Sequence, residues 1–159
     1  MNVAPAGFTL NRDLPAGFAE FYLPLHERFT PLQQRLAHAR VEQLARAHAG
    51  QLPTYLPPSE ATTTSWRIEL PQWCQDQRNQ MTGPADDAEL VVKMLNSGAP
   101  GVMLDLEDSM ANTWEHLMLG HENLVAALYG ELSYEDRKRG GTAHIKPSST
   151  AVWNRVRGL

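Results

Sequence analysis

The sequence has little of several features that mark particular classes of protein. Cys74 is the only cysteine among 159 residues, so no disulfide can form within the chain and a reducing compartment is expected. No apolar run approaches the roughly 20 residues of a membrane-spanning helix. Basic residues form no block and the formal net charge is −4, which argues against nucleic-acid binding. The first residues do not resemble a secretory signal, so we expect a cytoplasmic protein that needs neither membrane nor nucleic acid.

The composition that remains is typical of an ordinary globular protein. Hydrophobic residues make up 42% and charged residues 20% of the chain, which is long enough for one domain with a sizeable core. Thr30 followed by Pro31 is typical of a helix start, and apolar residues then recur at helical spacing. We predict a helix over 31–48. Because Pro24 interrupts the preceding pattern, we expect one short helix or two turns over 16–29.

The second half of the chain alternates between strand-like and helix-like segments. A proline-rich stretch over 50–63 predicts an extended linker before this change. We predict strands over 79–82, 101–106 and 151–156, and helices after Gly83-Pro84 and over 114–129. This alternation indicates an α/β fold with a parallel sheet. The expected division is a helical domain with its linker over 1–63 and a sheet-forming domain over 64–159.

The segment Asp105-Leu106-Glu107-Asp108-Ser109 lies at the end of the predicted strand over 101–106. Because strand side chains alternate, Asp105 and Glu107 share one face, at the edge where α/β folds bind ligands. The other face carries Val102, Leu104 and Leu106, which we expect covering helices to bury. Two such carboxylates repel each other, and a cation such as Mg²⁺ would relieve that repulsion. In the alternative interpretation, Asp108 and Ser109 merely cap the next helix and the other acids are solvated. The motif alone leaves both interpretations open.

Arg155 lies near the end of the last predicted strand, 151–156. A guanidinium at such a strand end could bind a carboxylate or stabilise a developing oxyanion. The alternative is a surface arginine that pairs with a nearby acid.

Several motifs follow one another in a specific order. They are MTGP at 81–84, LNSGA at 95–99, MLDLEDS at 103–109, TW at 113–114, GHENL at 120–124 and RVRGL at 155–159. As a set, they make the chain resemble malate synthase, specifically the shorter A-type isoform. The resemblance covers roughly 16–159 and is densest over 78–159.

This resemblance implies an acyltransferase of the glyoxylate cycle. Malate synthases condense glyoxylate with acetyl-CoA and hydrolyse the thioester to release malate and CoA, using Mg²⁺ on a TIM barrel with an N-terminal helical clasp. By resemblance, Arg155 would be the catalytic arginine that contacts glyoxylate and stabilises negative charge on the reacting oxygens. Asp105 and Glu107 would lie beside the metal, where they would hold its waters rather than bind it directly.

The expected barrel is incomplete. A TIM barrel takes roughly 250 residues, and 64–159 can supply about three of its eight strands. In the family, the direct metal ligands and the catalytic aspartate lie on later strands. We therefore expect an N-terminal fragment that is inactive alone and has the missing C-terminal part of the enzyme as its partner.

Two other functions are compatible with parts of the sequence. A lyase resembling the citrate lyase β-subunit also carries a Leu-Glu-Asp strand end and a metal, but Trp114, Gly120 and the helical N-terminal region argue against it. A non-catalytic remnant that acts as an interaction module is the second alternative. Such a remnant should carry charges at its barrel edges, whereas Val102 and Leu104 are apolar.

Overall fold

The computed structural model describes residues 5–158, which divide into two compact units. One unit is Pro5–Arg67, and the other begins at Ile68. Residues 1–4 and Leu159, which belong to the predicted domains 1–63 and 64–159, lie outside the described residues. The fold is mixed α/β, with one long helix and a small parallel sheet.

The first unit is helical. Its helices are α1 (Leu10–Asp13), α2 (Phe18–His48) and α3 (Glu60–Thr63). Because α2 runs unbroken through Pro24 and Pro31, the predictions of a break at Pro24 and of a helix start at Pro31 are wrong. Each proline removes one backbone hydrogen bond, and a helix of 31 residues has many others to retain. Thr30 caps nothing, and its hydroxyl instead contacts Nδ1 of His26 at 3.1 Å within the helix.

The predicted linker over 50–63 contains neither helix nor strand until α3 begins at Glu60. Ser59 starts this short helix through a capping box with Thr62, whose hydroxyl accepts a hydrogen bond from the Ser59 amide at 2.9 Å. The proline-rich composition therefore predicted the extended part of the segment but not its helical end.

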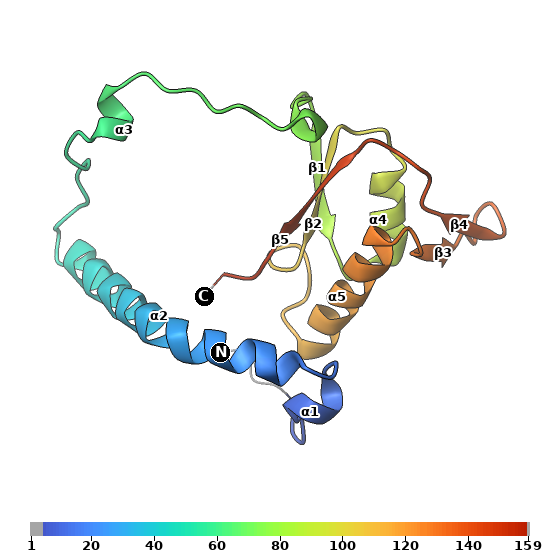
Figure 1. Ribbon diagram of the computed structural model, residues 1–159, viewed down its shortest axis with the longest axis horizontal. Coiled ribbons are helices and arrows are strands. Elements are labelled where there is room, and N and C mark those ends of the chain that lie inside the picture. The colour runs from blue at the N-terminus through green and yellow to red at the C-terminus, as the bar shows by residue number, and fades with distance from the viewer. Residues whose placement is uncertain (1–4, 159) are drawn as a thin grey trace. The chain divides into compact units, whose positions relative to one another are not determined.

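The second unit contains a three-stranded parallel sheet in the order β1-β2-β5 (Figure 1). Its strands are β1 (Gln80–Pro84), β2 (Gly101–Asp105) and β5 (Ala151–Arg155). All three predicted strands are present. Strand β1 is longer than predicted, because it includes Gly83 and Pro84 instead of ending before them. Pro84 is tolerated here because β1 is an edge strand of the described sheet.

Helices α4 (Ala88–Leu95) and α5 (Trp114–Leu128) cover one face of this sheet (Figure 1). Helix α4 is capped by Asp87, whose carboxylate accepts a hydrogen bond from the Leu90 amide at 2.9 Å. The core lies between the helices and the sheet, where Val102, Leu104 and Leu106 of the predicted apolar face are at most 1% exposed. The predicted apolar face of this strand is thus confirmed.

A β-hairpin that the sequence pattern did not predict packs beside α4. It consists of β3 (Ser133–Glu135) and β4 (Thr142–His144), which pair antiparallel. Gly140 and Gly141 lie at its tip, where they adopt φ values of 75° and 87° that favour glycine. The hairpin is tied to the end of α4 by Asn96, whose amide donates to the His144 carbonyl at 2.9 Å. A short 3₁₀ helix, Gln72–Cys74, precedes β1.

Candidate active site at the carboxyl ends of β2 and β5

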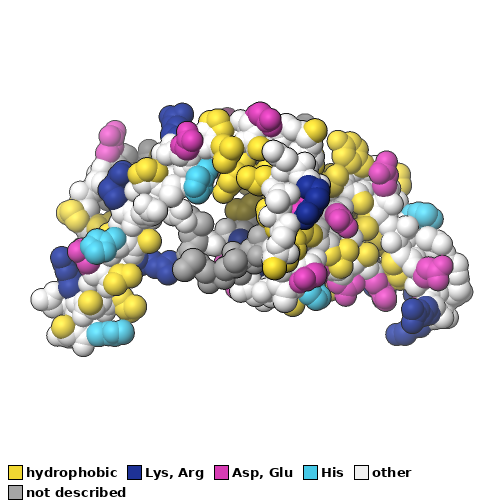
Figure 2. Space-filling model, turned by 90° about the horizontal axis from the view of Figure 1, so that it is seen from below, with side chains coloured by type: hydrophobic (Ala, Val, Ile, Leu, Met, Phe, Trp, Pro, Cys, Tyr) yellow, Lys and Arg dark blue, Asp and Glu magenta, His cyan; other side chains and the backbone are white. Residues whose placement is uncertain are grey.

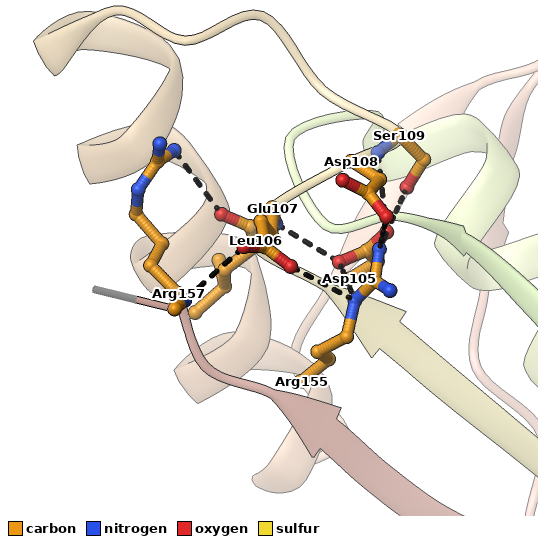
Figure 3. A network of polar contacts seen from close by, with 8 residues as sticks. Asp105, Leu106, Glu107, Asp108, Ser109, Arg155 and Arg157 are labelled. Carbon is orange, nitrogen blue, oxygen red and sulfur yellow. Dashed lines mark hydrogen bonds and ion pairs between the residues drawn. The ribbon is translucent and has the colours of Figure 1, made fainter. Parts of the chain in front are cut away.

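The site begins with the pairing of two neighbouring strands. Asp105 and Arg155 are the last residues of β2 and β5, and they lie directly opposite each other in the parallel ladder. The guanidinium of Arg155 donates through Nε to Oδ1 of Asp105 at 2.8 Å and through Nη2 to Oδ2 at 2.7 Å (Figure 3). Such a two-point ion pair fixes both the distance and the plane of the two groups.

Asp105 is buried, with its side chain only 1% exposed. Besides the two bonds from Arg155, its carboxylate accepts bonds from the Glu107 amide at 2.9 Å, the Ser109 amide at 3.1 Å and the Ser109 hydroxyl at 2.7 Å. Hydrogen bonds from Arg155, followed by those from Ser109 and Glu107, hold the pKa of Asp105 well below its usual range despite burial. Asp105 is therefore a fixed anion within the fold.

Two further acids flank the guanidinium and are more open to solvent. Oε2 of Glu107 lies 3.8 Å from Nε of Arg155, and the Glu107 side chain is 35% exposed. Oδ2 of Asp108 lies 2.9 Å from Nη2 of Arg155, and the Asp108 side chain is 76% exposed. The pKa of Arg155 is raised, first by its hydrogen bonds to Asp105 and then by the negative charges of Asp105 and Asp108. The structure thus brings together all three residues that the sequence singled out.

The chain that follows β5 closes over the acidic segment. The Gly158 amide donates to Oε1 of Glu107 at 3.2 Å. The Arg157 guanidinium donates to the Leu106 carbonyl at 3.4 Å (Figure 3) and to Oδ1 of Asn112 at 2.6 Å. Sequence reasoning assigned no role to Arg157. Its spacing of two from Arg155, which places both side chains on the same side of an extended chain, was the available signal.

The alternative interpretation of Asp108 and Ser109 as helix caps is wrong. Helix α5 is capped by Thr113, whose hydroxyl accepts a hydrogen bond from the His116 amide at 3.3 Å. Ser109 instead points back to Asp105 (Figure 3). The alternative for Arg155, pairing with an acid, is present in the structure. Its principal partner, however, is the buried Asp105 at a strand end rather than a surface carboxylate.

A second polar pair escaped sequence analysis. Asp86 follows β1, His116 lies in the first turn of α5, and Oδ2 of Asp86 contacts Nδ1 of His116. The Asp86 side chain is 11% exposed and that of His116 is 48% exposed. No short-range pattern connects two residues that are 30 positions apart, and only the packing of α5 beside the end of β1 brings them together.

The cluster has the composition of a cation site but an incomplete set of ligands. The three carboxylates of Asp105, Glu107 and Asp108 outnumber the guanidinium groups of Arg155 and Arg157, so the cluster carries a net negative formal charge. Within residues 5–158, no three Asp, Glu, His or Cys side chains are arranged to hold a metal ion. Asp105 already accepts five hydrogen bonds, more than the roughly four lone-pair positions of a carboxylate. Glu107 is the acid whose exposure and few hydrogen bonds fit a metal-bound water.

A cavity of about 630 Å³ adjoins Arg155. Its lining is largely apolar and includes Met103, Trp153 and the buried Cys74.

In the described part of the chain, no helix combines the length and the apolar character that a membrane crossing requires.

Comparison with known proteins identifies relatives. The chain is 35% identical over 144 residues to the glyoxysomal malate synthase of Zea mays, an alignment that covers 87% of this chain and 25% of that protein. It is 32% identical over 157 residues to malate synthase A of Escherichia coli, covering 98% of this chain and 29% of the relative. A malate synthase of Streptomyces clavuligerus is 33% identical over 132 residues, or 81% of this chain and 24% of the relative. No family model matches the chain.

These similarities confirm the predicted resemblance. The chain is similar to malate synthases over most of its own length, and it spans about a quarter of the length of the curated relatives that it matches.

Proposed function

We propose, from this homology, that the chain forms part of a malate synthase-type acyltransferase that joins glyoxylate and acetyl-CoA and releases malate and CoA. The observation that carries the proposal is the convergence of Asp105, Glu107 and Arg155 at adjoining strand ends. In α/β folds, this edge of the sheet is where substrates bind. We further propose that the protein acts in the cytoplasm.

Arg155 is the residue that we assign to the substrate. Two of its N–H groups are committed to Asp105, and its side chain remains 34% exposed. A guanidinium that is fixed on one edge and open on another can bind the carboxylate of a 2-oxo acid, and it can stabilise negative charge that develops on a reacting oxygen. Because its pKa is raised, Arg155 stays protonated and acts through its charge rather than by proton transfer.

Magnesium fits this site through Glu107 rather than through Asp105. When bound, Mg²⁺ supplies Lewis-acid polarisation of the substrate carbonyl. Glu107, which lies within 3.8 Å of Arg155 and is partly exposed, would hold a water of the ion. Asp105 was expected to share that task, but its oxygens are occupied by donors from the protein. We therefore propose that Asp105 holds Arg155 in place and that Glu107 alone holds the metal-bound water.

In the proposed enzyme, the two units would form different structural parts. We propose that residues 1–63 form a helical clasp with its linker and that 64–159 form the first strands and helices of a TIM barrel. Three adjacent parallel strands with helices on one face are compatible with such a barrel. The direct metal ligands, the catalytic base and the acetyl-CoA contacts would then come from the part of the enzyme that corresponds to the remaining length of the relatives.

Binding of oxalate, a stable analogue of glyoxylate, tests the role of Arg155. Isothermal titration of the chain should detect oxalate binding that Arg155→Ala removes. Arg137→Ala is the matched control, because Arg137 lies at the hairpin tip outside the site and its loss should leave binding unchanged. Equal binding by the wild-type protein and Arg155→Ala would remove Arg155 from the proposed site.

Turnover tests the proposed division of the enzyme. The purified chain, supplied with glyoxylate, acetyl-CoA and Mg²⁺, should release no CoA, because the proposed metal ligands and base lie elsewhere. Clear CoA release by this chain would overturn the proposal that further residues are required.

A further inference from the structure

The loop after β2 returns to the buried carboxylate from which it departs. Ser109 reaches Oδ2 of Asp105 twice, with its amide at 3.1 Å and with its hydroxyl at 2.7 Å. The same oxygen receives Nη2 of Arg155 at 2.7 Å. One carboxylate oxygen thus joins the serine hydroxyl to the guanidinium of the strand end (Figure 3).

We propose that Ser109 is a positioning residue for Arg155 that acts through Asp105. The inference rests on the proposed function, in which Arg155 meets the substrate. The carboxylate of an aspartate turns easily about its last torsion, whose energy profile is broad. Its plane is therefore set by its hydrogen-bond donors, and in a two-point pair that plane also sets the plane of the guanidinium. The Ser109 hydroxyl fixes one end of this chain of contacts, and the open edge of Arg155 lies at the other.

Other roles for the hydroxyl are already filled. Thr113 caps α5, so Ser109 is not needed to start that helix. The loop itself is held by the burial of Leu106 and Met110, which are 1% and 9% exposed. The amide of Ser109 would still reach Asp105 after a change of side chain. Loss of the hydroxyl should therefore alter Arg155 selectively and leave the loop folded.

The proposal can be tested on the chain itself by nuclear magnetic resonance, with no substrate present. The Nε–H of Arg155 is bonded to Oδ1 of Asp105 and should exchange slowly with water. In Ser109→Ala, this exchange should be roughly tenfold faster, which is the scale expected for loss of one hydrogen bond to a charged group. Ser109→Thr retains a hydroxyl and should restore slow exchange. Ser148→Ala is the matched control, because Ser148 is an exposed serine outside the site.

The Nη–H groups of Arg157 are the internal reference, because they donate to the Leu106 carbonyl and to Asn112 and so hold the same loop. Selective acceleration at Arg155, with rescue by Ser109→Thr, supports the proposal. Unchanged exchange at Arg155, or equal acceleration at both arginines, overturns it. If Ser109→Ala does not fold, Ser109→Cys takes its place, because a thiol of similar shape is only a weak donor. Failure of the proposed function would be seen separately, as absence of oxalate binding.

Discussion

Helices α2 and α4 both carry apolar side chains at helical spacing, yet only α4 buries them. In its eight residues, α4 buries Val91, Val92, Met94 and Leu95. None of the 31 residues of α2 is buried, and its apolar side chains include Phe21 at 66% and Leu36 at 62% exposed. Figure 2 shows hydrophobic side chains at the surface of the molecule. A helix of eight residues is too short to persist alone, so α4 depends on the sheet, whereas α2 relies on its own backbone hydrogen bonds.

The largest effect should come from truncating the core beneath α4. Leu104 is fully buried, and Leu104→Ala should lower the free energy of unfolding by roughly 3–5 kcal/mol, because it loses burial and leaves a cavity. Leu36→Ala in α2 removes the same atoms from an exposed site and should change the free energy of unfolding by less than about 0.5 kcal/mol. Urea unfolding followed by tryptophan fluorescence measures both. Equal losses of unfolding free energy in the two variants would show that Leu36 of α2 is packed as closely as Leu104 beneath α4.

Removing the buried acid should come next. Asp105→Ala takes away the carboxylate that pairs with Arg155 and leaves the amides of Glu107 and Ser109 without their acceptor. We expect the free energy of unfolding to fall by about 3 kcal/mol in the same urea experiment. Asp13→Ala is the control in the helical unit, since Asp13 pairs with Arg12 in an exposed position, and it should change little. A small loss of unfolding free energy in Asp105→Ala would contradict this prediction, because it would mean that water replaces the hydrogen bonds of Asp105 at little cost.

A smaller effect should follow from loss of a buried amide. Asn123 of α5 is 6% exposed and donates to the Ala85 carbonyl at 2.9 Å. Asn123→Ala should cost about 2 kcal/mol, because the carbonyl loses its buried donor. Asn154→Ala, at an exposed position of β5, is the control. Hydrogen exchange of the Ala85 amide, which donates to the Asp105 carbonyl, would show whether the end of β1 loosens.

The smallest effect concerns acidity. Because the folded pKa of Asp105 is lowered, its contribution to stability is complete above the unfolded pKa of about 4 and is lost as the pH falls toward the folded pKa. The wild-type chain should therefore lose more stability than Asp105→Asn between pH 5 and the lowest pH that it tolerates. If the urea midpoints of the two proteins fall in parallel as the pH is lowered, protonation of Asp105 does not contribute to the pH dependence of stability.

Much of the second unit could be predicted because its signals are local. The apolar run over 101–106 and the acids after it located β2 and the site, and the strand pattern over 151–156 located Arg155. The hairpin of β3 and β4 was not predicted, because strands of three residues are too short to display the alternation of apolar and polar side chains. Helix α2 was divided in the prediction because proline is a local signal, whereas persistence of a long helix is a cumulative property.

The partner of Asp105 was beyond local reasoning. Sequence spacing placed Asp105 and Glu107 on one face of a strand, and both were therefore expected to serve a metal. Which acid is buried depends on the register between β2 and β5 and on the return of Ser109, and no local pattern encodes either. Arg155 lies 50 residues from Asp105 in sequence.

The position of Asp105 and Arg155 on the same rung of adjoining strands has a consequence for how this protein can vary. The separation of the pair is set by the spacing of the ladder and not by the segment that joins the strands. Insertions or deletions around the hairpin tip should therefore leave the guanidinium and its acid in place. A slip of β5 by one residue would move Arg155 along the sheet by about 3.3 Å and turn it to the opposite face. Variation should be tolerated along the connecting segment and penalised at the junction of the two strands.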